Sequence, residues 1–274
     1  MNVLSLFDGI SCGRLALERT GIPVATYYAS EIDKHAITVS KANWPDIVQL
    51  GDVCNINPED LPKIDLIFAG SPCQGFSSNG KQTGLEHKQS RLFWEFIRLL
   101  KALKPKHYIL ENVSMKQEWR DIISKEVGCE PLKINSSLLS AQSRPRLYWT
   151  NIPGVTAPED KGLTIFDILE FPADPVQPMV TRARKSYCLT ATHGNCLGKD
   201  GLPIPSEIIH NTKRHQRTCI IHNDHWRMLS PVECERLQTV PDGYTSSVTQ
   251  RQRYRCLGNG WTVDVIAHLL SFKL

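Results

Sequence analysis

The sequence lacks any apolar run that approaches the ~18 residues a membrane-spanning helix needs. Its first residues, MNVLSLFDGIS, also lack the basic flank and small-residue cleavage site of a secretory signal peptide. The nine cysteines contain no C-x-x-C pair, so neither a zinc finger nor a disulfide framework is indicated. We therefore expect a soluble protein with reduced thiols and no metal site, cytoplasmic in a prokaryotic or phage context and nuclear in a eukaryotic one.

Positive charge is concentrated in the last third of the chain. Residues 1–175 carry 19 Lys and Arg against 21 Asp and Glu, whereas residues 176–274 carry 13 against 7. Nine of these basic residues form three small clusters: Arg182, Arg184, Lys185, Lys213, Arg214, Arg217, Arg251, Arg253 and Arg255. Such clusters suit a surface that contacts phosphates. A solvated basic face without a partner explains the charges equally well.

Short apolar strands alternate with helical stretches in the first half of the chain. Strands are expected at 3–6, 25–29, 65–69 and 107–110, and an amphipathic helix at 92–104. This alternation predicts an α/β fold built from βαβ units, with a mainly parallel, doubly wound sheet. Because ligands of such sheets bind at the carboxyl ends of the strands, the polar residues that follow these strands should share one edge.

The pattern changes after about residue 155, where prolines become frequent and hydrophobic periodicity is weak. We expect three parts: a first domain over 1–154, a small loop-rich lobe over 155–225, and a C-terminal segment over 226–274 that returns to the first domain. Within that last segment, Ser230 and Pro231 are typical of a helix start, which predicts a helix over 230–238. A second helix is expected over 261–270, packed against the first domain.

The ends of the first three strands carry residues that suit a nucleoside. FDGISCG places two glycines at a strand-to-helix turn, where backbone N–H groups can approach a ligand. Glu31 follows the second strand, where an acid can bind ribose hydroxyls, and Asp52 follows the third, where it can accept from an adenine amino group. The turn is not a full G-x-G-x-x-G, so S-adenosylmethionine fits better than NAD. Two surface acids beside an ordinary turn remain the alternative.

Cys73 lies just after an apolar strand, in the stretch IDLIFAGSPCQGFSS. A free cysteine is most often a small buried hydrophobe. Here, however, Pro72 stiffens the chain before the thiol, and Gly75 with the following serines opens the turn after it. No second Cys or His stands at metal-ligand spacing. The surroundings therefore favour a nucleophile over a packing residue or a metal ligand.

An acid and two arginines complete the candidate chemistry. Glu111 ends the apolar run HYIL and is a candidate proton donor, or alternatively an acid at a helix N-terminus. In QSRPRLYW, Arg144 and Arg146 are two residues apart and would therefore lie on one face of an expected strand. Gln142, two residues earlier, would lie on the same face. Two arginines on one face can bind an anion or a carbonyl oxygen.

Together these motifs resemble those of the cytosine carbon-5 DNA methyltransferases. The resemblance runs in order along nearly the whole chain through FDGISCG, EID, GDV, GSPCQGFS, SRLFWEF, ENV, QSRPRLYW, RLQTVPDGY and LGNGWTVDVI. DGI-x-x-G, the short variable segment and the Trp after GNG look most similar to small phage or bacterial orphan enzymes and to the catalytic domains of animal de novo methyltransferases. Ser11, Cys12 and Gly260 depart from the commoner residues, from which we expect altered cofactor packing and retained activity.

The resemblance implies a Rossmann-like, S-adenosylmethionine-dependent methyltransferase fold and a covalent mechanism. Cys73 would attack carbon 6 of a cytosine flipped out of double-stranded DNA, which makes carbon 5 able to accept the methyl group. Glu111 would protonate or hydrogen-bond the ring N3. Arg144 and Arg146 would steady the base, with Gln142 in support. S-adenosyl-L-homocysteine would be the product.

The resemblance also implies binding residues. Those for the cofactor are Phe7, Asp8, Gly9, Ile10, Glu31, Ile32, Asp52, Val53, Pro72, Leu92, Asn259 and Trp261. Residues 1–154 would form the catalytic and cofactor-binding domain, and 155–225 the target recognition lobe that reads the major groove. Candidate DNA contacts are Ser77, Arg182, Arg184, Lys185, Thr190, Thr192, His193 and Asn195. Arg236 would brace the lobe against the catalytic domain.

Three other functions compete with this one. A tRNA methyltransferase of the same family usually carries a Cys-Phe-Thr signature in the variable segment, and that signature is absent. An inactive DNA-binding relative would not need the intact Cys73, Glu111 and arginine pair. An NAD-dependent oxidoreductase would explain the first three strand ends and nothing after residue 70. We expect a monomer, and the motifs indicate neither a target sequence nor a companion restriction enzyme.

Overall fold

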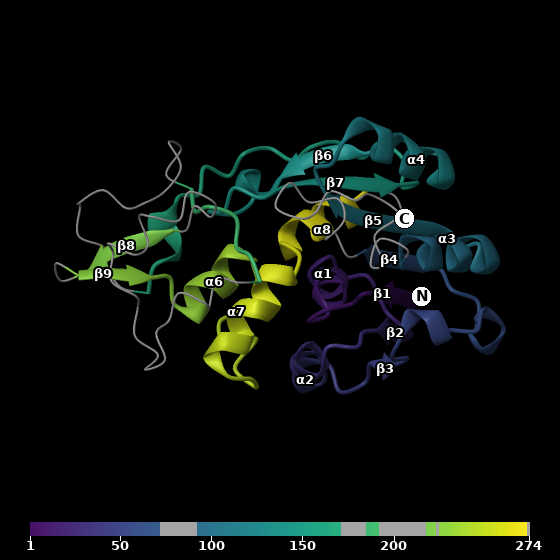
Figure 1. Cartoon of the computed structure of the whole chain (residues 1–274), viewed down its shortest axis with the longest axis horizontal. Helices are drawn as coiled ribbons and strands as arrows, with labels where there is room; N and C mark the ends of the chain where they lie inside the picture. The colour runs from purple at the N-terminus through teal and green to yellow at the C-terminus, as the bar shows by residue number, and fades with distance from the viewer. Residues whose placement is uncertain (72–91, 171–184, 192–217, 223–224, 273–274) are drawn as a thin grey trace. The chain divides into compact units, whose positions relative to one another are not determined.

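The computed structural model describes residues 1–71, 92–170, 185–191, 218–222 and 225–272, and the chain divides into two compact units (Figure 1). Unit 1 comprises Met1–Ile134, Pro145–Ala157 and Ile266–Leu274, and unit 2 comprises Asn135–Arg144 and Pro158–Val265. The chain passes from unit 1 to unit 2 at 157/158 and returns to unit 1 at 265/266. Residues 226–265 belong to unit 2, where helix α6 (Pro231–Leu237) packs against helix α7 (Gln250–Asn259) and the short helix η5 (Ile165–Ile168).

Unit 1 is built around a seven-stranded sheet with the order β3-β2-β1-β4-β5-β7-β6. Its strands are β1 (Asn2–Leu6), β2 (Thr26–Ser30), β3 (Val48–Gln49), β4 (Leu66–Gly70), β5 (His107–Val113), β6 (Leu132–Asn135) and β7 (Pro145–Thr150). β1 to β5 run parallel, and β7 pairs with β5 in the antiparallel sense. The predicted α/β fold with a mainly parallel sheet is confirmed.

One face of the sheet is covered by two helices, α3 (Leu92–Leu103) and α4 (Gln117–Val127). Leu4, Ile67 and Leu110 of the strands pack in one core with Phe96 of α3 and Ile123 of α4. All five side chains are fully buried. Strands this apolar on both faces are typical of a parallel sheet between two helical layers. The helix expected at 92–104 is thus present, with its apolar stripe on the sheet.

The opposite face carries α1 (Cys12–Arg19), which lies very close to the strands. A Cβ added to Gly13 would stand 2.7 Å from Cδ2 of Phe68 on β4 and 2.9 Å from the hydroxyl oxygen of Tyr27 on β2. No side chain fits at that distance. The second glycine of FDGISCG is therefore explained by helix-to-sheet packing, and only Gly9 lies in the turn itself.

The remaining elements are short. Unit 1 also contains α2 (Lys34–Asn43), η1 (Val53–Asn55) and η2 (Pro58–Asp60), and unit 2 contains η4 (Ser136–Leu138), η5 (Ile165–Ile168), the hairpin β8 (Cys219–His222) and β9 (His225–Met228), α6 (Pro231–Leu237) and α7 (Gln250–Asn259). Helix α6 begins at Pro231 with Ser230 as its N-cap, as predicted, and Glu233 completes a capping box with Ser230. The last helix, α8, spans Val263–Leu270, and its part from Ile266 onward belongs to unit 1.

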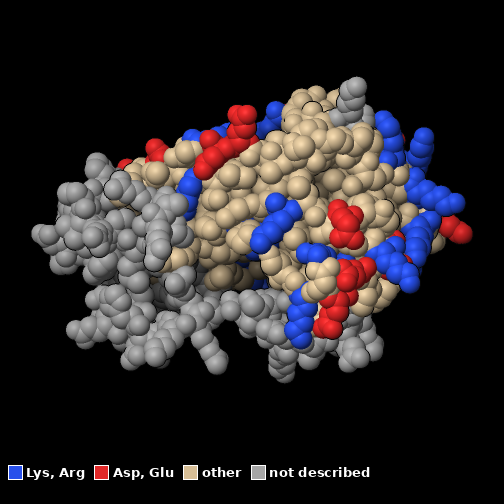
Figure 2. All heavy atoms as spheres, turned by 90° about the horizontal axis from the view of Figure 1, so that it is seen from above, with Lys and Arg blue, Asp and Glu red and all other residues tan. Residues whose placement is uncertain are grey.

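On the face shown in Figure 2, basic and acidic side chains lie among one another at one end of the described surface. The basic clusters expected at 182–184 and 213–217 fall outside the described residues. Within the described ranges, no helix is long and apolar enough to cross a membrane.

Candidate active site

The turn after β1 passes through three left-handed residues. φ is 58° at Phe7, 61° at Gly9 and 60° at Ser11, a conformation that is easy for glycine and strained for the other two. Turns in which the sign of φ alternates direct backbone N–H groups to one side, which makes them binding sites for electron-rich groups. The structure thus shows a non-standard backbone at the position where the sequence predicted a ligand turn.

Glu31 connects this turn to the end of β2. Its Oε2 accepts a hydrogen bond from the Gly9 N–H at 2.8 Å, and its Oε1 accepts from the N–H groups of Ile32 and Asp33, each at 2.8 Å. A carboxylate has about four acceptor sites, so capacity remains for the hydroxyls of a ligand. Ile32, next to it, is 74% exposed. An open apolar side chain beside an acid suits a nucleobase and its ribose.

The other predicted cofactor residues of unit 1 are placed as follows. Asp52 caps η1, its Oδ1 accepting from the Cys54 N–H at 3.0 Å. Ile10 and Val53 are buried, and Phe7 and Leu92 pack against the core under α3. Asp52 therefore places a carboxylate shortly after β3, whereas the apolar residues support the fold.

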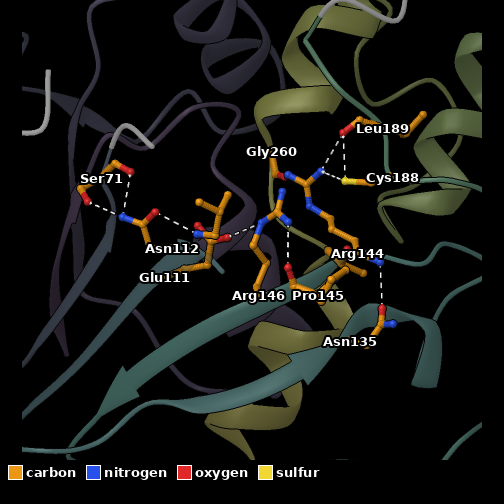
Figure 3. A network of polar contacts seen from close by, with 12 residues as sticks. Ser71, Glu111, Asn112, Asn135, Arg144, Pro145, Arg146, Cys188, Leu189 and Gly260 are labelled. Atoms are coloured by element: carbon orange, nitrogen blue, oxygen red, sulfur yellow. Dashed lines mark hydrogen bonds and ion pairs between the residues drawn. The ribbon is translucent and has the colours of Figure 1, made fainter. Parts of the chain in front are cut away.

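Glu111 and Arg146 form a largely buried ion pair (Figure 3). Arg146 Nε lies 2.8 Å from Glu111 Oε1, and the two side chains are 14% and 11% exposed. The antiparallel register of β5 and β7 pairs Glu111 with Tyr148 and Val113 with Arg146, which makes the acid and the arginine diagonal neighbours. Glu111 lies inside β5 and not just beyond it. Because water screens this pair poorly, the arginine holds the carboxyl group in one orientation.

Asn112 was not among the predicted site residues, yet it holds the end of the strand that leads to Cys73. Its Nδ2 donates to Oγ of Ser71 at 3.0 Å, its Oδ1 accepts from the Val113 N–H at 2.8 Å, and both Asn112 and Ser71 are buried. Ser71 immediately precedes Pro72 and Cys73, which lie outside the described residues. The motif ENV could have identified Asn112 from the sequence, because a buried amide side chain in a strand needs specific hydrogen-bond partners.

Arg144 differs from Arg146 in its partners. It is 5% exposed and donates to four acceptors: the backbone oxygens of Leu189 (2.9 Å), Gly258 (3.1 Å) and Gly260 (2.9 Å), and Sγ of Cys188 (3.3 Å). The expected alternation of both arginines along one strand does not occur, since β7 begins at Pro145. Gly258 and Gly260 lie at the C-terminal end of α7, where carbonyl groups lack helical partners and a cation is favourable. Arg144 caps this helix.

Two buried glutamines extend the Arg144 network within unit 2. Gln142 accepts from the Leu189 N–H at 2.7 Å and donates to Gln238 Oε1 at 3.3 Å. Gln238 donates to the backbone oxygens of Leu257 at 2.6 Å and Gly260 at 3.1 Å. These contacts hold the backbone on both sides of the exposed Asn259, and the half-buried Trp261 comes immediately after Gly260.

The structure corrects the prediction that Lys185 contacts DNA. Lys185 is buried, and its Nζ donates to the backbone oxygens of Ser137 at 2.6 Å and Ser140 at 3.3 Å. The ammonium donates its hydrogen bonds to carbonyl groups around the short helix η4, so it is not available to a phosphate. Thr190 is half-buried, and the other candidate DNA contacts lie outside the described residues: Ser77, Arg182, Arg184, Thr192, His193 and Asn195.

Arg236 connects two segments of the chain within unit 2. It forms a two-point pair with Asp242 at 2.9 and 2.6 Å and donates to the backbone oxygen of Ile168 at 3.1 Å. This contact joins the end of α6 to η5. The pair with Asp242 holds the pKa of that carboxyl below its usual range, through hydrogen bonding first and charge second.

Replacing Arg144 with lysine is expected to lower the free energy of unfolding by about 2 kcal/mol, the scale of lost hydrogen bonds to a charged group. Lysine keeps the charge, but its ammonium cannot span separate carbonyl groups as a planar guanidinium does. Urea denaturation measures the change. Arg236→Lys is the matched control, because its partners are more exposed and its pair contributes little. Equal losses in the two variants would contradict the capping role.

The sequence matches one known protein family over most of its length. Residues 1–124 and 158–271 match the model of the family described as C-5 cytosine-specific DNA methylase. The type II methyltransferase M.NlaX of Neisseria lactamica is 28% identical over 96% of this chain and 93% of its own length. M.HhaI of Haemophilus parahaemolyticus is 27% identical over 98% of this chain and 93% of its own length.

Solved structures share the fold. The methyltransferase EhMeth of Entamoeba histolytica superposes with a TM-score of 0.74 at 18% identity, covering 98% of this chain and 96% of its own. A putative DNA modification methyltransferase encoded within an E. coli prophage gives 0.69 at 22% identity, covering 99% and 97%.

Proposed function

The chain belongs to the family of C-5 cytosine-specific DNA methylases and is a DNA cytosine methyltransferase; we propose that it uses S-adenosylmethionine and a transient bond between Cys73 and the base. The observation that carries this proposal is the buried pair of Glu111 and Arg146, beside which Asn112 anchors the chain just before Cys73. An acid held in place near the strand end that leads to the predicted nucleophile fits addition to a cytosine ring.

The residues at the strand ends of unit 1 fit the nucleoside half of the cofactor. Glu31 has remaining acceptor capacity for ribose hydroxyls, Ile32 offers an open apolar surface for the adenine face, and Asp52 can accept from its amino group. When bound, S-adenosylmethionine supplies a methyl group on a positively charged sulfur. Asn259 and Trp261 are proposed to bind the methionine half, and Arg144 and Gln142 act there only through the backbone that they hold.

The chemistry assigned to the chain proceeds in three steps. The Cys73 thiolate adds to carbon 6, while Glu111 gives a proton or hydrogen bond to ring N3, so that the electrons of the ring double bond become available at carbon 5. Carbon 5 then takes the methyl group. Finally a base removes the proton from carbon 5, the double bond re-forms, the thiolate leaves carbon 6, and any proton that ring N3 received returns to Glu111. Arg146 keeps Glu111 oriented throughout through Oε1.

The target base must leave the duplex, because stacking hides carbon 6 from a thiol. We propose that residues 155–225 form the lobe that reads the DNA, and that the enzyme serves DNA modification, as its curated relatives are named type II methyltransferases. A tRNA substrate and an inactive relative are not favoured, since the matched family is one of DNA methylases.

Trapping with 5-fluorocytosine tests the proposed mechanism. Fluorine at carbon 5 cannot leave as a proton, so the adduct with Cys73 should persist after methyl transfer. We expect a denaturation-resistant complex with duplex DNA that forms only when S-adenosylmethionine is present. The same duplex with ordinary cytosine and a fluorinated tRNA are the controls. A wild-type protein that methylates DNA without forming this complex would overturn the covalent mechanism.

A further inference from the structure

Beneath the turn after β1 lies a cluster of polar side chains in the interior of unit 1. Ser5 of β1, Tyr27 of β2, Ser40 of α2 and the turn residue Ser11 are each at most 2% exposed. Oγ atoms of Ser11 and Ser40 lie 2.6 Å apart. Apolar residues would pack this space without a desolvation cost, so the presence of so many polar groups calls for a functional reason.

Asp8 is the acid that these groups surround. Tyr27 donates its hydroxyl to Oδ1 at 2.8 Å, and Ser11 donates its hydroxyl to Oδ2 at 2.5 Å. Both carboxylate oxygens therefore accept from the protein. The side chain points into the cluster, whereas Asp8 was predicted to be a cofactor-binding residue.

The bond to Ser11 fixes the strained end of the turn. Ser11 is left-handed and makes no side-chain cap to α1, because its hydroxyl donates to Asp8. On the other side of Asp8, the backbone N–H of Gly9 is held by Glu31. Asp8 and Glu31 thus define the conformation of the turn from its inner and outer sides.

Holding an ionised carboxyl group here costs stability. Desolvation raises the pKa of Asp8 from 3.8 to about 6, while hydrogen bonds from Ser11, Ser5 and Tyr27 lower it and the charge of Glu31 raises it further. Because the folded-state pKa exceeds the unfolded one, the contribution of Asp8 to stability is present below pH ~4 and is lost as pH rises through about 6. At neutral pH this carboxylate therefore opposes folding, which argues against a purely structural role.

We propose that Asp8 is a positioning residue for cofactor binding: its carboxylate, held by the hydroxyls of Tyr27 and Ser11, keeps the turn from Phe7 to Ser11 in the conformation that binds S-adenosylmethionine. The inference rests on the proposed function. Two titratable groups face Asp8 from the neighbouring elements, namely Glu31 after β2 and Tyr27 on β2. The charge of the Cys12 thiolate of α1 would in turn raise the pKa of Tyr27. When Asp8 takes up a proton, one oxygen becomes a donor, and the hydroxyl network that fixes Ser11 must rearrange.

The test is calorimetric binding of S-adenosylhomocysteine without DNA, from pH 5 to 8.5, to wild type and Asp8→Asn. Asparagine resembles the protonated acid, so the variant should bind about tenfold more weakly at pH 8, the scale of one hydrogen bond to a charged group. Wild-type affinity should fall below pH ~6, and the variant should lack this step. The thermal stability of the variant at pH 8 should equal or exceed that of wild type.

Two further variants make the outcome decisive. Asp65→Asn is the matched control, because Asp65 also accepts a hydrogen bond from the protein. Its partner is the Asn2 N–H at 2.8 Å, at the amino ends of β1 and β4 and therefore away from the turn. It should keep wild-type affinity and pH dependence. Tyr27→Phe removes a hydrogen bond that lowers the pKa of Asp8, so the pH at which affinity falls should move upward. This shift decides the question even if Asp8→Asn does not fold.

The two possible failures can be distinguished. Wild-type protein that binds no S-adenosylhomocysteine at any pH contradicts the proposed function. Wild-type protein that binds well, with Asp8→Asn unchanged in affinity and Tyr27→Phe unchanged in pH dependence, contradicts the role of Asp8 alone. An affinity loss accompanied by an equal loss of stability would assign Asp8 to the fold.

Discussion

Replacing Cys73 with serine is expected to abolish methyl transfer to DNA while leaving the binding of S-adenosylhomocysteine near the wild-type level. Addition to carbon 6 needs a strong nucleophile, and a thiol with a pKa of ~8.5 supplies far more anion at neutral pH than a serine hydroxyl. The proposed nucleoside contacts at Glu31, Ile32 and Asp52 do not involve the thiol. Transfer of tritiated methyl groups to duplex DNA and calorimetry measure the two quantities.

Cys129→Ser is the matched control for that experiment. Cys129 is a half-buried free thiol whose Sγ lies 3.2 Å from the hydroxyl of Tyr108, and Tyr108 also donates to the Val127 backbone oxygen. The substitution should therefore keep both activity and cofactor binding. Unchanged turnover in Cys73→Ser would refute the nucleophile assignment, and loss of cofactor binding in that variant would show that Cys73 acts on the fold of the site.

Replacing Glu111 with glutamine is expected to reduce kcat about 10²- to 10⁴-fold, the range for removal of a general acid. Glutamine has nearly the same shape and can still accept from Arg146 Nε through its amide oxygen, so the geometry of the pair should survive. It cannot give a proton to ring N3. The rate of adduct formation with 5-fluorocytosine should fall by the same factor as kcat, because the proton assists the attack itself.

Glu126→Gln is the control for the loss of a charge. Glu126 also forms an ion pair, with Lys101 at 2.8 Å, but the lysine side chain is 64% exposed. Exposed pairs contribute at most about 1 kcal/mol, and no reacting group is proposed there, so turnover should stay unchanged. If Glu111→Gln instead turned over as fast as this control, Glu111 would be a structural partner of Arg146 and no acid.

The sheet could be predicted because its signal is local. The apolar runs that predicted strands at 3–6 and 107–110 lie within observed strands, and the run at 65–69 overlaps β4 in all but its first residue, since segments buried on both faces contain few polar residues. The helix start at Ser230 and Pro231 was predictable for the same reason, because an N-cap followed by proline is a local signal. The division into units was harder, because the packing of α6 on α7 depends on contacts between distant residues.

The partners of long polar side chains could not be predicted from spacing. Arg144 and Arg146 are two residues apart, yet one caps α7 and the other pairs with Glu111. Lys185 looked like part of a basic cluster, yet its ammonium is enclosed by carbonyl groups. The reach of these side chains exceeds the distance between neighbouring elements, so the backbone that surrounds them decides the contact.

By itself, the sequence determined the family, the parallel sheet and the types of residue at each strand end, because these depend on local pattern and on motifs that the chemistry requires. Only the tertiary structure decided that Asp8 faces inward, that Asn112 holds Ser71 and that Gly13 serves helix packing. The physical reason is that a hydrogen bond or a close packing contact involves two segments of the chain. The local sequence of either segment does not give the distance between them in the folded protein.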